Sequence, residues 1–259
     1  MIIEETPERS VVLERIDISQ LTPEIFNRKY RDKNVPVIIT GGLEDIQEWS
    51  IDLLRDKLSE GSYPVRCYGS GHFDKPKAEW SKYCELQDMT IDEYADQLTS
   101  RHAHNNNHYL AQVAVGDKPL AEVLRNSMER LADNTGMRKI TDMGLWLGPN
   151  GHTEPLHWDC GDGTVLMLHG AKKVKLFSPR HNTNLYPFPL YKGGAAPWFS
   201  QVYVDQPDFE VFPKLEEAIK HKIEFTLSKG EILYIPACWW HELSSAGDDF
   251  YTCSINRFW

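Results

Sequence analysis

The chain has 259 residues, a hydrophobic content of 41% and a formal net charge of −10 at pH 7. These values predict a globular protein of one or two domains with a sizeable core, and the acidic balance argues against a large nucleic-acid footprint. No apolar run approaches the roughly 20 residues of a membrane span. Its five cysteines include no Cys-x-x-Cys pair, so neither a disulfide framework nor a zinc finger is indicated. We expect a soluble protein of the cytoplasm or nucleus.

The first hundred or so residues are predicted to be mainly helical around one or two strands. Thr22 is a helix N-cap and Pro23 suits the first helical position, which predicts a helix to about Lys33. Thr90–Glu93 has the spacing of a capping box before a helix that ends near Ser100. Residues 119–133 carry apolar side chains at helical intervals that we expect to face the core: Leu120, Val123, Leu124, Met128 and Leu131.

From Asp142 onward the pattern changes to short β runs separated by Gly and Pro. This pattern suits a double-stranded β-helix, a jelly-roll barrel whose wide mouth holds a site. Residues 186–221, rich in Pro and aromatic side chains, are predicted to interrupt the barrel as an insert and to border the substrate.

The motif His157-Trp158-Asp159 predicts a metal site. In a strand the side chains at i and i+2 share a face, so His157 and Asp159 can hold one ion together. His241 follows 84 residues after His157, at the end of a second apolar run. Two imidazoles and one carboxylate on one face of an octahedron leave the other positions open, as in non-heme Fe(II) oxygenases. We therefore expect Fe(II) at these three residues and a cosubstrate and O2 at the open positions.

The bare His-x-Asp/Glu triplet is a weak signal, because the chain contains three. His72 belongs to a turn-rich stretch that predicts a surface loop, and His152 follows another turn that could lie near the site. Only His157 begins an apolar segment. His102 and His104 lie in a polar stretch, which we expect to be a loop rather than a second metal site.

Residues 170–179 predict a strand with a lysine on its apolar face. Lys172 shares that face with Val174, whereas Lys173 and Lys175 face the other way. A lysine on the apolar face needs an anionic partner, because an unpaired buried ammonium is costly. An internal salt bridge and the distal carboxylate of a dicarboxylate cosubstrate are both open as that partner.

Residues from about Tyr109 to Trp259 resemble the JmjC family of Fe(II)- and 2-oxoglutarate-dependent oxygenases, and most closely its small hydroxylase branch, which includes the asparaginyl hydroxylase factor inhibiting HIF. Matching stretches follow the family's order with similar gaps: Tyr109–Gln112, Leu145–Pro149, Pro155–Asp159, Gly170–Pro179, Gly230–Pro236 and Trp239–His241. Val35–Gly41 is similar to the strand that opens the domain in these proteins. The resemblance implies a mainly β, cupin-like jelly-roll fold: a catalytic core at 109–259 with the insert at 186–221, and a helical and strand region at 1–108 packed on the barrel.

Residue by residue, the resemblance implies Fe(II) ligands at His157, Asp159 and His241. It also implies that Lys172 and Tyr109 contact the C5 carboxylate of 2-oxoglutarate.

The resemblance further places Asn256 near the C1 carboxylate and the metal. The family often has Thr or Ser three residues before the first iron histidine, where this chain has Glu154, and asparagine six residues after it, where this chain has Gly163. A carboxylate at Glu154 would repel the cosubstrate unless it turns outward. We therefore expect Thr153 or Thr164 to supply the hydroxyl instead.

The sequence predicts a dioxygenase that uses Fe(II), 2-oxoglutarate and O2 to hydroxylate a C–H bond, on a protein side chain rather than a free metabolite. A JmjC lysine demethylase is an alternative, although the cysteines leave no room for a zinc-bound reader module. A tRNA hydroxylase is not excluded, but the acidic charge disfavours nucleic acid. A metal-binding cupin without turnover is the non-enzyme alternative. Because the chain stops 18 residues after His241, where the asparaginyl hydroxylases continue into dimer-forming helices, we expect a monomer or a different dimer.

Overall fold

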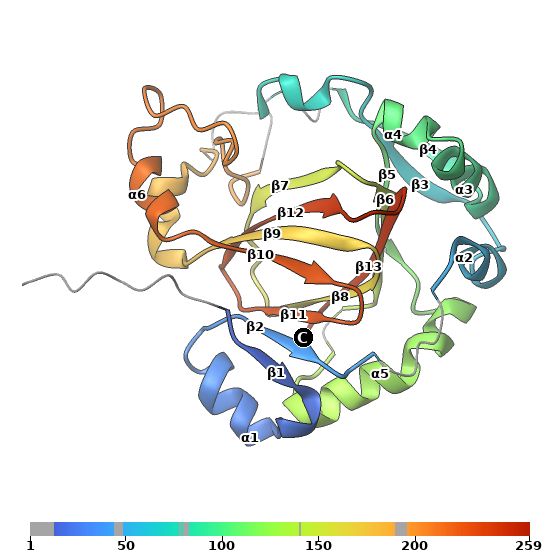
Figure 1. Ribbon diagram of the computed structural model, residues 1–259, viewed down its shortest axis with the longest axis horizontal. Helices are drawn as coiled ribbons and strands as arrows, with labels where there is room; N and C mark the ends of the chain where they lie inside the picture. The colour runs from blue at the N-terminus through green and yellow to red at the C-terminus, as the bar shows by residue number, and fades with distance from the viewer. Residues whose placement is uncertain (1–12, 44–48, 78, 80–82, 140, 190–195) are drawn as a thin grey trace, which may run out of the picture.

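The computed structural model describes residues 13–43, 49–77, 79, 83–139, 141–189 and 196–259. Within these residues the strands form a large sheet of nine strands and a small sheet of four, at the centre of the molecule (Figure 1). The large sheet has the order β1 (Arg15–Asp17), β2 (Val37–Thr40), β11 (Ile232–Ile235), β8 (Gly163–His169), β13 (Tyr251–Phe258), β6 (Gly144–Pro149), β5 (His108–Ala114), β3 (Tyr63–Cys67) and β4 (Glu85–Met89). The small sheet has the order β10 (Ile223–Ser228), β9 (Ala171–Phe177), β12 (Trp240–Ala246) and β7 (Thr153–His157).

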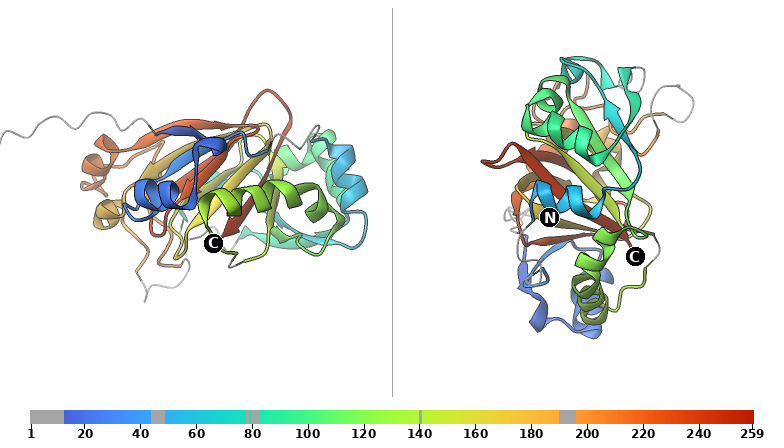
Figure 2. Two further views of the ribbon diagram at one scale, coloured as in Figure 1. Left: turned by 90° about the horizontal axis from the view of Figure 1, so that it is seen from below. Right: turned by 90° about the vertical axis from the view of Figure 1, so that its right-hand side faces the viewer.

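Helices lie around the margin of the two sheets. They are α1 (Pro23–Phe26), which continues as a π-helical turn over Asn27–Arg31, α2 (Ile51–Lys57), α3 (Ile91–Thr99), α4 (His102–Asn106), α5 (Pro119–Thr135) and α6 (Leu215–Lys220). α1 packs against α5 below β1 and β2 in Figure 1, and Figure 2 shows α5 lying across the strands. α2 packs against α3, which also contacts β4. No helix in the described part of the chain has both the length and the apolar character of a membrane span.

The predicted helices are confirmed in type and start. The Thr22 hydroxyl accepts the Ile25 N–H ahead of α1, and Thr90 and Glu93 form the reciprocal capping box of α3. The predicted core positions lie on α5 as expected. Leu120, Leu124, Met128 and Leu131 are buried, and Val123 is half-buried against the same core.

The expectation of one or two strands in the first hundred residues is wrong. β1, β2, β3 and β4 all precede residue 90, and each belongs to the large sheet. β4 was missed because it is an edge strand in which four of five side chains are exposed, so it has no apolar alternation to detect. Since the strands on both sides of residue 108 share one sheet, the division into 1–108 and 109–259 stays a prediction.

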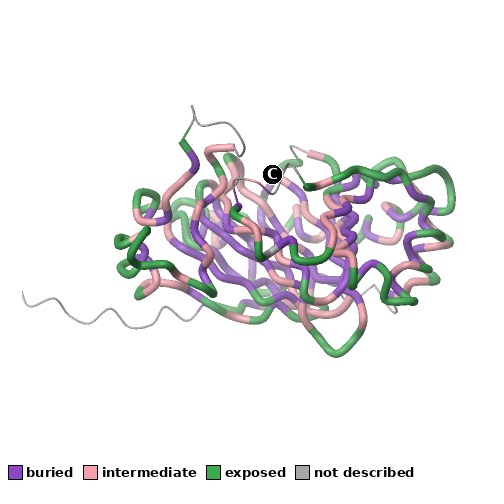
Figure 3. Tube along the Cα trace, turned by 90° about the horizontal axis from the view of Figure 1, so that it is seen from above, coloured by how far each residue is buried: buried purple, intermediate pink, exposed green. Residues whose placement is uncertain are grey.

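Apolar side chains are buried in layers. On the outer face of the large sheet they pack against α1, α2, α3 and α5. Between the sheets, Met167 and Leu233 of the large sheet pack against Val174 and Leu176 of the small one. Buried residues accordingly run along the central strands, whereas exposed residues gather in the connections (Figure 3). The mainly β, jelly-roll fold predicted from the sequence is confirmed.

The outer face of the small sheet is covered by α6 and parts of the predicted insert. Leu185, Val202 and Leu215 pack there with Phe177 and Trp240. Residues 190–195 of the insert lie outside the described residues. That the insert borders the substrate stays a prediction.

Candidate metal centre and its cavity

The three predicted metal ligands come together where β7 and β12 pair. His157 and His241 are directly opposite each other in this antiparallel pair, and Asp159 follows two residues after His157. One ligand atom from each of the three residues lies within 4.8 Å of the others. His241 Nε2 is 3.4 Å from Asp159 Oδ2. In the described residues, no other group of three His, Cys, Asp or Glu side chains meets this separation.

His157, Asp159 and His241 are called the metal group below. Backbone carbonyls orient both of its imidazoles. His157 Nδ1 is 2.7 Å from the Pro155 carbonyl oxygen, and His241 Nδ1 is 2.9 Å from the Trp239 carbonyl oxygen. Because a carbonyl only accepts, each Nδ1 carries the proton and each Nε2 presents a lone pair. Hydrogen bonding of the second ring nitrogen is the usual support of a metal-bound histidine.

The protonation states also suit a metal. Burial and the nearby His241 together lower the pKa of His157 to about 4, so the His157 imidazole is neutral at pH 7. Burial alone would raise the pKa of Asp159, but contact with His241 lowers it below its usual range. Neutral imidazole nitrogens and an ionised carboxylate are the donors that Fe(II) takes, so the three residues fit the predicted ion.

The metal group opens into a cavity of about 300 Å³ between the two sheets. The lining includes Arg66, Gln112, Trp146, Glu154, Thr164, Lys172, Trp198, Phe199, Asn256 and Phe258. Polar and aromatic side chains therefore share one partly open cavity with the metal group, which suits a small anionic cosubstrate and the reacting end of a larger substrate.

Lys172 lines this cavity and contacts Tyr109, which lies behind the lining residues. Lys172 Nζ donates a hydrogen bond of 3.1 Å to the Tyr109 hydroxyl, and both side chains are buried. A Cβ atom on Gly148 would lie 2.0 Å from the Tyr109 ring, so only glycine permits this ring position. Burial lowers the pKa of Lys172 to about 8, against the opposing charge of Glu154. The structure brings these two residues together, and their contact with a cosubstrate stays a prediction.

Asn256 and Thr164 line the same cavity, as their predicted roles require. Asn256 Oδ1 accepts a hydrogen bond of 2.9 Å from Trp146 Nε1, and Thr164 Oγ1 accepts one of 2.7 Å from Trp259 Nε1. A Cβ atom on Gly144 would lie 2.4 Å from Asn256 Oδ1, so this amide too lies over a glycine of β6.

Thr153 does not line this cavity, which corrects one of the two expected hydroxyl positions. Its hydroxyl lies 2.8 Å from Ser244 Oγ and faces a second hollow, lined also by Lys77 and Glu242. Side chains alternate along a strand, and Glu154 takes the inward position next to Thr153. Of the two candidates, Thr164 is the one on the cavity wall.

Glu154 points inward, which is the orientation in which its carboxylate was expected to repel the cosubstrate. A bulge explains the geometry: His241 pairs with His157 and Leu243 with Glu154, so β7 has one residue more than β12 over this span. Both Glu154 and His157 therefore line the cavity. Burial would raise the pKa of Glu154, but His152 and Arg66 lower it to about 2.

The remaining histidines lie in more ordered places than their sequence context suggested. His72 is buried within a short 3-10 helix, with its ring 4.3 Å from that of Tyr68, so the predicted surface loop is wrong. His152 is buried and stacks on Tyr109 with ring centroids 3.6 Å apart. His102 begins α4 rather than a loop.

Sequence reasoning missed Arg66 and Gln112 in the cavity wall. Arg66 lies on β3 directly opposite Tyr109 on β5, a pairing that no local pattern reveals. Gln112 has a positive φ of 55° at a bulge between β5 and β6. A non-glycine residue in this backbone region is strained and often functional, but its sequence gives no sign of that conformation.

The cupin-like domain model matches residues 22–259. The chain belongs to this cupin-like family. Its relatives include JmjC domain-containing protein D of Dictyostelium discoideum, which is 28% identical over 87% of this chain and 52% of its own length. Lysine-specific demethylase 8 of Danio rerio is 28% identical over 91% of this chain and 56% of its own length. HSPB1-associated protein 1 of Mus musculus is 37% identical over 44% of this chain and 23% of its own length.

This cupin-like chain spans about half the length of the first two relatives. The resemblance to the JmjC family is confirmed by the family model and by the names of these relatives. At 28% identity the comparisons do not separate the small hydroxylase branch from the demethylases, so the branch stays a prediction.

Proposed function

We propose that this cupin-like chain is an Fe(II)- and 2-oxoglutarate-dependent oxygenase. The observation that carries the proposal is that His157, Asp159 and His241 open into the same cavity as Lys172. A metal-binding protein without turnover needs only the first three. Bound Fe(II) would supply O2 activation at the positions that these ligands leave open.

Five residues in or beside the cavity have a part in this proposal. Lys172 and Tyr109 bind the C5 carboxylate of 2-oxoglutarate, because together they offer an ammonium and a hydroxyl. Asn256 lies near the C1 carboxylate, and Thr164 offers a hydroxyl in place of the family's usual Thr or Ser. Phe199, whose ring lies 5.4 Å from that of His157, keeps bulk water from the metal.

We propose a protein side chain as the substrate and hydroxylation of a C–H bond as the reaction. The negative net charge of the chain disfavours tRNA, and the cysteines include no pair with the spacing of a zinc-bound reader module. The compartment and the oligomeric state stay predictions from the sequence.

Demethylation is the second candidate, because relatives named lysine-specific demethylases align with most of the chain. The two reactions differ in their products. Oxidation of an N-methyl group gives an unstable product that releases formaldehyde, whereas hydroxylation of a carbon not bound to nitrogen gives a stable gain of one oxygen atom.

The test is incubation of the purified protein with Fe(II), 2-oxoglutarate and either a protein extract or methyl-lysine peptides. We expect succinate that depends on Fe(II), together with a stable mass gain of one oxygen on an extract protein. Formaldehyde in step with succinate on the methylated peptides would favour demethylation. No Fe(II)-dependent succinate under any condition would contradict the oxygenase proposal itself.

A further inference from the structure

We infer that Arg66 is a positioning residue for the cosubstrate: it pairs with Glu154 and so leaves Lys172 available to an anionic ligand. The inference rests on the proposed function. It concerns a charge arrangement particular to this chain, because the family's usual Thr or Ser at the position of Glu154 carries no charge.

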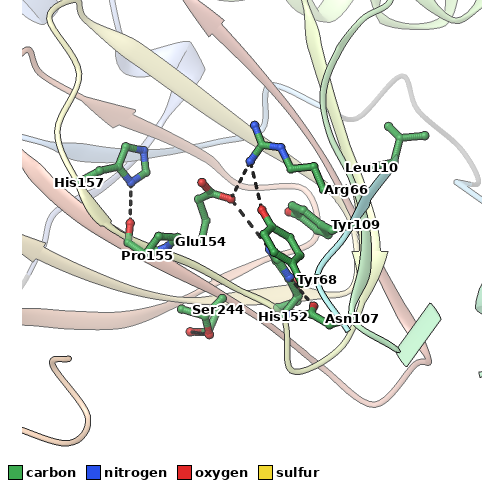
Figure 4. A network of polar contacts seen from close by, with 12 residues as sticks. Arg66, Tyr68, Asn107, Tyr109, Leu110, His152, Glu154, Pro155, His157 and Ser244 are labelled. Carbon is green, nitrogen blue, oxygen red and sulfur yellow. Dashed lines mark hydrogen bonds and ion pairs between the residues drawn. The ribbon is translucent and has the colours of Figure 1, made fainter. Parts of the chain in front are cut away.

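Arg66 and Glu154 form an ion pair. Arg66 Nη1 lies 3.7 Å from Glu154 Oε2 and also donates a hydrogen bond of 3.5 Å to the Tyr68 hydroxyl. Figure 4 shows the Arg66 guanidinium reaching from its strand across Tyr68 to the Glu154 carboxylate. The side chain of Glu154 is only 11% exposed and that of Arg66 is 31% exposed, so water screens the carboxylate weakly.

Two side chains with basic nitrogens lie near the Glu154 carboxylate, Arg66 and His152, and Arg66 is the one that is charged at pH 7. The Glu154 Oε2 atom is buried and has no hydrogen-bond partner among the described residues, and His152 Nε2 is 3.9 Å away. Burial lowers the pKa of His152, so that ring is neutral at pH 7 and adds no cation. An ionised carboxylate in such a place is stable only beside a fixed positive charge.

Without Arg66, Lys172 is the cation left to Glu154 on the same cavity wall. Among the described residues Lys172 donates one hydrogen bond, to the Tyr109 hydroxyl, whereas an ammonium has three donors. A carboxylate that turned toward it would occupy the positive charge that the cosubstrate needs. Arg66 therefore acts through Glu154 rather than on the ligand.

The sum of the formal charges in the cavity also supports a role for Arg66 in cosubstrate binding. Arg66 and Glu154 cancel, which leaves Lys172 as one cation matched to one distal carboxylate. A divalent ion held by the metal group would bring two positive charges, of which Asp159 offsets one and leaves one for the second carboxylate of 2-oxoglutarate. Removal of Arg66 leaves the cavity one negative charge in excess, whereas removal of both Arg66 and Glu154 restores the balance.

A double-mutant cycle tests the inference by binding rather than turnover. The proteins are wild type, Arg66→Met, Glu154→Gln and the double variant, each loaded with Mn(II) and titrated with 2-oxoglutarate in a calorimeter. We expect Arg66→Met to weaken binding on the order of tenfold or more. Glu154→Gln should stay within about threefold of wild type, and the double variant should recover to within about fivefold.

Arg55→Met is the matched control. Arg55 forms ion pairs with Asp92 and Asp96 and does not line the cavity, so its loss should leave 2-oxoglutarate binding unchanged. Mn(II) affinity without 2-oxoglutarate and the melting temperature report whether each variant keeps its metal site and fold.

Three results would overturn the inference. The first is Arg66→Met binding as wild type, and the second is a double variant as weak as Arg66→Met, which would mean that Arg66 contacts the ligand itself. The third is a tenfold loss of 2-oxoglutarate affinity in Glu154→Gln. This third result can be obtained even if the Arg66 variants do not fold. If wild type binds Mn(II) but no 2-oxoglutarate, the proposed function fails and this inference fails with it.

Discussion

The two faces of the small sheet each bury a lysine of β9, and they satisfy it differently. Lys175 lies on the outer face, where Glu242 at 2.9 Å and Asp205 at 2.5 Å both pair with its ammonium. Lys172 lies on the inner face, where its hydrogen bond goes to a neutral tyrosine. Burial would lower the pKa of either lysine, but Glu242 and Asp205 raise that of Lys175, whereas the pKa of Lys172 falls to about 8.

This difference separates a structural ion pair from a binding site. On the outer face two carboxylates of the protein itself pair with the ammonium, so no anionic ligand is needed. On the inner face Glu154, the carboxylate whose charge acts on Lys172, is paired with Arg66, so a positive charge remains in the cavity beside the metal group. A buried cation that the fold does not neutralise indicates a ligand more specifically than a buried cation alone.

Substitutions in the metal group should have the largest effect on activity. His157→Ala, Asp159→Ala or His241→Ala should each abolish Fe(II)-dependent succinate formation, because each removes one of three protein ligands. The measurement is succinate release together with Mn(II) binding by calorimetry. His104→Ala, on the exposed surface of α4, should keep both. Wild-type turnover in His157→Ala would refute the metal assignment.

Substitution of Lys172 should affect ligand affinity, whereas substitution of Lys175 should affect stability. Lys172→Ala should weaken 2-oxoglutarate binding about a hundredfold while metal binding persists, because breaking a buried ion pair costs about 3 kcal/mol at the low end. Lys175→Met leaves Glu242 buried without its partner, so it should lower the free energy of unfolding by about 3 kcal/mol and leave the affinity of the folded protein unchanged. Calorimetric titration and urea unfolding measure the two quantities. Equal effects of both variants on binding would break the comparison between the faces.

A change of pH should alter the affinity for 2-oxoglutarate by less than the Lys172→Ala substitution does. The Lys172 ammonium is lost as the pH rises through about 8, so affinity for 2-oxoglutarate should be full at pH 7 and about tenfold weaker at pH 9. Its neighbours stay constant over this range, because burial raises the pKa of Tyr109 and raises that of Cys253 to about 12, while the pKa of Glu154 is about 2.

The same lowered pKa has an opposite effect on folding. The unfolded lysine, with a pKa of 10.5, binds more protons than the folded one, so Lys172 makes the ligand-free protein more stable as the pH rises from about 8 toward 10.5. Affinity that does not change between pH 7 and pH 9 would show that the ammonium is not the ligand's partner.

The smallest effect is expected at Lys173, which lies between Lys172 and Lys175 in the sequence and is exposed. Lys173→Ala should change both binding and the free energy of unfolding by less than about 0.5 kcal/mol. The same calorimetric and urea measurements apply. Sensitivity at Lys173 with silence at Lys172 would mean that the strand register is off by one residue.

Strand parity explains how much of the site was predictable. His157, Asp159 and Lys172 could be placed on inner faces because alternation along one strand is a local property of sequence. Glu154 could not, because the bulge that turns it inward depends on how β7 pairs with β12. The position of Arg66 could not be predicted either, since its place in the cavity depends on β3 lying beside β5, and β4, α3 and α4 come between these two strands in the sequence. The surface loop predicted at His72 failed for a related reason: turn-forming residues indicate a turn, but not what covers it.

Two glycines of β6 determine where Tyr109 and Asn256 can lie. Tyr109 and Asn256 come from the strands on either side of it, and each rests in a space that exists because Gly148 or Gly144 has no side chain. Gly148→Ala or Gly144→Ala would displace one of these groups without adding or removing any group that could touch a ligand. The shape of the pocket is therefore encoded partly in what β6 lacks, and a mutational scan restricted to side chains that line the cavity would overlook two of the positions that define it.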